Sequence, residues 1–144
     1  MNLYEKAQHI LDAIIAEAAV QDVALPEAQY AQLGTPVIAC PLVTVATAAP
    51  LSPVEETGPT KCNASQVATF QCIIARACGW TSDSTGADDP DAIASVSAQI
   101  AADVEIMWAA ASAYNGYLVK NWSVAWEISG GMSFVTLTLS TGVD

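Results

Sequence analysis

The last part of the chain alternates apolar and polar residues in two runs that flank Gly130-Gly131. On both sides of the glycines every second residue is apolar: Trp122, Val124, Trp126, Ile128, Val135, Leu137 and Leu139. Because successive side chains of a strand point to opposite faces, this pattern predicts a β-hairpin over residues 121–142 with one apolar and one wettable face. An isolated hairpin is marginal in water, so the rest of the chain must cover the apolar face. We therefore expect Trp122 and Trp126 to anchor the core.

Two other segments carry apolar residues at the spacing of three or four that is typical of an amphipathic helix. The first covers residues 3–20, with Asn2 as a plausible N-cap and Glu5 three positions later, a variant of the capping box. The second runs from Asp91 to Tyr114. Its start is marked by Asp89 as a capping carboxylate and by Pro90 at the first helical position. Its roughly 25 residues span about 37 Å, enough to lie across a whole sheet.

Strands are predicted between the two helices. Residues 25–34 are predicted to be extended, and residues 42–48 and 66–77 are rich in β-branched and apolar residues. The last two are expected to pair across a long loop, residues 50–63. Pro41 indicates that the strand after it lies at a sheet edge or begins only after the proline.

The four cysteines do not form a recognisable metal motif, because the chain has no CxxC and a single histidine, His9. Cys72 lies on the apolar parity of its strand and is predicted to be a small core residue. Cys40 and Cys78 both lie near the open base of the predicted 42–48/66–77 hairpin. They could come within disulfide distance or remain two reduced thiols.

The order of these elements is helix, strands, long helix and closing hairpin, without repeats or a linker that would divide the chain. It predicts a single α+β domain over residues 1–144. We expect a mainly antiparallel or mixed sheet of four to five strands, with the N-terminal helix, one long helix packed on the sheet and a C-terminal β-hairpin.

The chain is strongly acidic, with 15 Asp and Glu residues against 4 Lys and Arg and a net charge of −11 over 144 residues. Nucleic-acid affinity depends on clustered cations, so tight nucleic-acid binding is not expected, nor is adhesion to anionic membranes. No uninterrupted apolar run approaches the roughly 20 residues of a membrane span, and no signal peptide is recognisable. The chain is expected to be cytosolic when made. The acidity fits plain solubility or a surface that DNA passes without adhering.

No catalytic, metal or cofactor motif is recognised, and the chain is not expected to be an enzyme. Asp88, Asp89 and Asp91 lack the spacing of a calcium loop and are better explained by helix capping. Asp103 and Glu105 are two residues apart in the predicted helix, so they point to different sides and form no carboxylate pair.

Some apolar residues stand in segments predicted to be loops. Leu51 and Val54 lie among prolines, and Trp80 stands just outside a strand in a polar segment. Such residues can be interface anchors, or they can fold back onto their own core.

Several short stretches resemble the tail terminator family of siphophages, in particular those of actinobacteriophages. They are LPEAQYAQLG (25–34), LVTV after Cys40 (42–45), KCN (61–63) and the strand from Ala68 to Cys78, followed by the long helix and the Gly130-Gly131 hairpin. The resemblance spans almost the whole chain by pattern and order.

The resemblance implies a structural virion protein located in the neck region of the tail. Such subunits form a hexameric ring that ends tail-tube polymerisation and joins the tail to the head connector. The implied partners are further copies of the chain, the major tail tube protein and the connector or stopper protein, with DNA passing through the ring. The implied interface residues are those of the long loop and its neighbourhood: Leu51, Val54, Glu55, Glu56, Lys61 and Trp80.

The wettable face of the hairpin, with Glu127, Thr136 and Thr138, is a candidate for the ring's lumen. Two alternatives remain. One is another head–tail connector or neck ring subunit, a stopper or adaptor. The other is a small α+β ligand-binding module or enzyme with a pocket between the sheet and the long helix, which polar groups with perturbed pKa values lining that pocket would support.

Overall fold

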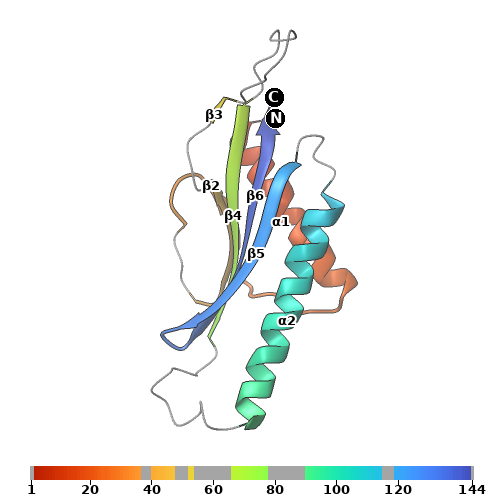
Figure 1. Cartoon of the computed structure of the whole chain (residues 1–144), viewed down its shortest axis with the longest axis vertical. Coiled ribbons are helices and arrows are strands. Elements are labelled where there is room, and N and C mark those ends of the chain that lie inside the picture. The colour runs from red at the N-terminus through yellow and green to blue at the C-terminus, as the bar shows by residue number, and fades with distance from the viewer. Residues whose placement is uncertain are drawn as a thin grey trace.

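The computed structural model describes residues 2–36, 40–47, 52–53, 66–77, 90–114 and 119–143, and these form one mixed sheet with two helices (Figure 1). The elements in chain order are α1 (Leu3–Val20), β1 (Gln29–Gln32), β2 (Leu42–Thr47), β3 (Ser52–Pro53), β4 (Gln66–Ala77), α2 (Pro90–Ala113), β5 (Val119–Ser129) and β6 (Met132–Val143). The predicted α+β fold is confirmed.

The strand order along the sheet is β1-β2-β4-β6-β5, and the two-residue β3 pairs with the start of β4. Only β1 and β2 are parallel among these pairs. The predicted pairing of residues 42–48 with 66–77 is confirmed, from Leu42 opposite Ala75 to Thr47 opposite Phe70. Since β2 begins directly after Pro41 and lies inside the sheet, the proline marks the start of a strand and not an edge position.

Both helices pack on the same face of the sheet and enclose the main core with it. α1 contacts β1 and β2, whereas α2 contacts β5 and β6. The buried strand residues alternate along β2, β4 and β6 as expected for one covered face: Val43, Val45, Ala68, Phe70, Cys72, Ile74, Val135, Leu137 and Leu139. A smaller cluster of Leu42, Ile73 and Ala75 lies on the opposite face.

The start of α1 has the predicted capping box. The Glu5 backbone amide donates to Asn2 Oδ1 at 2.8 Å, and the Asn2 amide donates to Glu5 Oε2 at 3.0 Å. Two amides that the helix itself leaves unpaired are thereby satisfied. α2 begins at Pro90, as its proline at the first helical position predicts.

The closing hairpin has the predicted register. Val124 lies opposite Leu137, and Glu127 lies opposite Phe134 on the other face. Gly130 and Gly131 have φ of 60° and 77°, and a two-residue hairpin turn with both φ values positive is one that glycine adopts without strain. The expectation that Trp126 anchors the core is wrong, because 61% of its surface is exposed. Trp122 is half-buried.

Cys72 is fully buried in the main core, which confirms its prediction as a small core residue. Burial raises the pKa of its thiol above the ordinary value. Burial also raises the pKa of Tyr114, and the negative charge that Cys72 would carry raises it further. The two alternatives for Cys40 and Cys78, a disulfide or two reduced thiols, stay open because Cys78 lies outside the described residues.

The buried thiol makes stability depend on alkaline pH. A pKa that is raised in the folded state means that the unfolded chain loses its proton first, so the stabilisation is present below about pH 8.5 and is lost as the pH rises. We expect the free energy of unfolding to fall by up to about 1.4 kcal/mol per pH unit above that point. Urea denaturation under reducing conditions at several pH values measures this slope. Cys72→Ala should flatten it, and equal slopes in both proteins would contradict the assignment.

Candidate functional site

An apolar groove lies between the outer side of α2 and the helix-facing side of β5. We define this tryptophan groove by its apolar lining residues: Ile100, Ala101, Val104, Trp126 and Ile128. Ser97 and Glu105 are the other described residues that line it, and the volume is about 500 Å³. Because Trp126 is 61% exposed and Ile128 is 36% exposed, the groove presents large apolar side chains to solvent.

The groove exists because α2 and the hairpin diverge. Figure 1 shows the first turns of α2 and the tip of the β5–β6 hairpin pointing away from each other. All the buried residues of α2 lie from Ile100, its eleventh residue, onward. The helix therefore covers the start of β5 but not its end, where Trp126 lies.

A pair of tryptophans closes the covered end of this surface. The rings of Trp108 on α2 and Trp122 on β5 meet edge to face, with centroids 4.4 Å apart and planes at 81°. Trp108 follows Val104 by four residues, so it continues the same side of the helix. Trp108 remains 57% exposed, which extends the apolar surface beyond the groove itself.

The groove also borders an open edge of the sheet. β5 ends the strand order on this side, and no described strand pairs with its outer side. Its unpaired backbone amides and carbonyls are a ready template for another strand. The combination of exposed aromatic residues with an open strand edge is suited to binding a protein.

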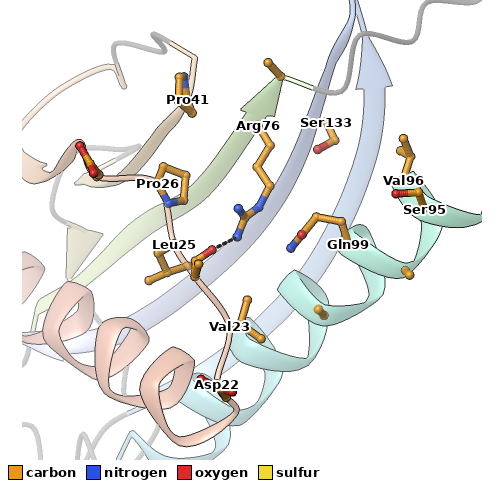
Figure 2. Close-up of a pocket in the computed structure, with 15 residues that line it drawn as sticks. Asp22, Val23, Leu25, Pro26, Pro41, Arg76, Ser95, Val96, Gln99 and Ser133 are labelled. Carbon is orange, nitrogen blue, oxygen red and sulfur yellow. Dashed lines mark hydrogen bonds between the residues drawn. The ribbon is translucent and has the colours of Figure 1, made fainter. Parts of the chain in front are cut away.

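A second, larger cavity of about 930 Å³ lies on the other side of α2, where the α1–β1 connection, the end of β4 and the first half of α2 meet (Figure 2). Arg76 projects into it from β4. Its Nε donates to Asp103 Oδ2 at 2.8 Å, and its Nη2 donates to Asp103 Oδ1 and to the Ala24 carbonyl, both at 2.9 Å. Gln99 Nε2 also donates to Asp103 Oδ1 at 3.3 Å.

This bidentate ion pair holds three segments together: β4, α2 and the connection that follows α1. The Asp103 side chain is 0% exposed and that of Arg76 is 17% exposed, so both charges are largely removed from water. Such a pair is retained only with good geometry, and losing one partner leaves a buried charge. The sequence prediction that Asp103 and Glu105 point to different sides is confirmed, since Glu105 is exposed.

The sequence-predicted site residues fall into two groups. The predicted interface residues Leu51, Val54, Glu55, Glu56, Lys61 and Trp80 lie outside the described residues, so their role stays a prediction. Glu127, Thr136 and Thr138 lie together on the sheet face turned away from the helices, opposite Phe134, Ala125 and Ser123 respectively. Whether that face lines a lumen also stays a prediction.

α2 has a composition that also fits a membrane helix. By length and apolarity alone it could cross a bilayer, although in this structure it packs on the sheet and carries the paired Asp103. Within the described parts of the chain, no group of three or more His, Cys, Asp or Glu side chains is placed to hold a metal ion.

Comparison with known proteins does not assign the chain to a family. No protein-family model matches it, and no curated protein matches it significantly.

The Arg76–Asp103 pair yields a stability prediction. Arg76→Met should lower the free energy of unfolding by about 3–5 kcal/mol, because it leaves the Asp103 carboxylate buried without its partner. Adding Asp103→Leu should restore a large part of this loss, since the apolar pair no longer has a buried charge. Chemical denaturation of the single and double variants measures the coupling, and strictly additive losses would contradict a direct interaction.

Proposed function

We propose that this chain is a structural subunit of a phage virion, a tail terminator that forms a ring at the head-proximal end of the tail tube. In this role it ends tube polymerisation and joins the tail to the head connector. The observation that carries the proposal is the tryptophan groove, an exposed apolar surface at an open sheet edge. The family resemblance of the sequence supplies the identity of the assembly.

The groove supports an assembly role because of its composition. Soluble monomers rarely expose large contiguous apolar surfaces, and tryptophan is enriched among residues that dominate the energy of protein interfaces. Among the described residues that line the groove, Glu105 is the one with a charge, in a chain with 15 acidic residues. A low charge density lets like-charged copies approach at this surface while the remaining acids keep the protein soluble.

The opposite face of the sheet supports the passage of DNA. In β5 and β6 it carries four hydroxyl residues (Ser123, Thr136, Thr138 and Ser140), the apolar Ala125 and Phe134, and the acid Glu127. A ring of such subunits with this face inward offers no cluster of cations to the phosphates. DNA then moves through the ring without specific binding.

Two alternatives account for less of the structure. Another neck ring subunit, a stopper or adaptor, uses the same kind of surface and differs in its partners. The cavity beside Arg76 favours a ligand-binding module, but two of the guanidinium nitrogens already donate to Asp103 and Ala24. The charged groups deepest in that cavity satisfy each other, so we place ligand binding second.

The proposal predicts a closed ring that limits tube growth. Native mass spectrometry and negative-stain imaging of the purified protein, alone and with the major tail tube protein, should show rings and tubes of limited length. Trp126→Ser should weaken ring formation about tenfold or more, because it removes an exposed aromatic anchor. Val20→Ser, at an apolar position that is 79% exposed on α1, is the matched control and should leave the rings unchanged.

Two results would reject this function. One is a protein that stays monomeric both alone and with the tube protein and leaves tube length unlimited. The other is partitioning of the folded protein into lipid vesicles with α2 protected from proteolysis, which would assign the apolar surface to a membrane.

A further inference from the structure

We infer that neighbouring copies of this chain join head to tail, with the β1 edge of one copy against the β5 edge and tryptophan groove of the next. The inference rests on the proposed ring and names the surfaces that build it. In this arrangement a second copy of the chain occupies the tryptophan groove.

The sheet has two open edges of different composition. The strand order ends at β1 on one side and at β5 on the other, and no described strand pairs with the outer side of either. An association between two different surfaces of the same chain is heterologous, so it closes into a ring when the rotation between copies permits. A two-fold dimer would instead join the same edge of both copies.

The directions of the edge strands are compatible with such a junction. β5 runs parallel to β4 because both are antiparallel to β6, and β1 runs opposite to β4 because it is parallel to β2. If copies are related by rotation about an axis along the strands, β1 of one copy meets β5 of the next in antiparallel orientation. This is the orientation that most adjacent strands of the sheet already adopt.

Both edges carry exposed apolar side chains. At the β1 edge, Tyr30 is 39% exposed and Leu33, directly after the strand, is 55% exposed. At the β5 edge, Trp126 and Ile128 are exposed. Ala31 belongs to the core, so its neighbour Tyr30 lies on the face turned away from the helices, whereas Leu33 shares the parity of Ala31. Backbone pairing between the edges would therefore bring Leu33 to the side of Trp126 and Ile128, with Tyr30 on the opposite face of the joined sheet.

Charge marks the β1 side as a surface that can be buried between copies. No residue between Glu27 and Glu55 is charged, although the chain as a whole has a net charge of −11. Proteins that avoid edge-to-edge association place charges, lysine above all, on their edge strands. β1 has no charged residue, and among the eleven residues of β5 only Lys120 and Glu127 are charged.

The test uses two variants that each block one edge. Tyr30→Lys places a charge at the β1 edge, and Trp126→Lys places a charge at the β5 edge. Leu33→Lys and Ile128→Lys are second variants for the same edges if either first variant fails to fold by circular dichroism. Val20→Lys adds the same charge to an exposed apolar position on α1, outside both edge strands, and is the matched control.

Head-to-tail joining predicts that each blocked variant alone forms no ring and that Val20→Lys forms rings like the parent. When the two blocked variants are mixed, the intact β5 edge of Tyr30→Lys meets the intact β1 edge of Trp126→Lys. Native mass spectrometry should then detect a one-to-one heterodimer that grows no further, since its outer edges are both blocked.

The contradicting results separate this inference from the proposed function. If the parent forms rings but Tyr30→Lys does so too, the β1 edge is not an interface and only the inference fails. If Tyr30→Lys forms homodimers, or the mixture stays monomeric, head-to-tail joining is likewise wrong. If the parent itself never associates, alone or with the tube protein, the proposed function and the inference fail together.

Discussion

Coverage of one sheet face by two helices is the constraint on which the rest of this structure depends. β4 and β6 pair over twelve residues each, and their helix-facing side chains form the centre of the core. α1 covers the β1–β2 side and α2 covers the β5–β6 side. Since α2 diverges from the hairpin before β5 ends, Trp126 and Ile128 are left uncovered. The surface proposed for assembly is this uncovered remainder of the core-facing side.

The Arg76–Asp103 pair lies close to the point where α2 diverges from the hairpin. None of the first ten residues of α2 is buried, and Asp103 follows Ile100 as one of the first buried side chains of the helix. The bidentate contact with Arg76 therefore fixes the helix to β4 near the point where close packing begins.

Local patterns in the sequence predicted most of the fold. The capping box at Asn2, the start of α2 at Pro90 and the hairpin around Gly130-Gly131 depend on residues a few positions apart, and all three are confirmed. The exposure of Trp126 could not be predicted in this way. Strand alternation assigns a side chain to a face, but how far a helix extends over that face depends on tertiary packing.

The same reasoning explains the missed role of Asp103. Its partner Arg76 is 27 residues earlier and in a strand, so no helical spacing connects the two. A carboxylate on the apolar side of a predicted amphipathic helix was the only available signal. The residues predicted as an interface in the long loop lie outside the described residues, whereas the groove was found only from the geometry of α2 and β5.

The central claim is that the groove side of β5 becomes buried when copies of the chain assemble. Hydrogen exchange by mass spectrometry, compared between dilute monomer and assembled ring, measures this directly. We predict slower exchange in the ring for the amides of β5 and of β1, with little change at the buried centre of β4 and β6. Assembled rings in which the β5 amides exchange as fast as in the monomer, while amides elsewhere become protected, would contradict the account.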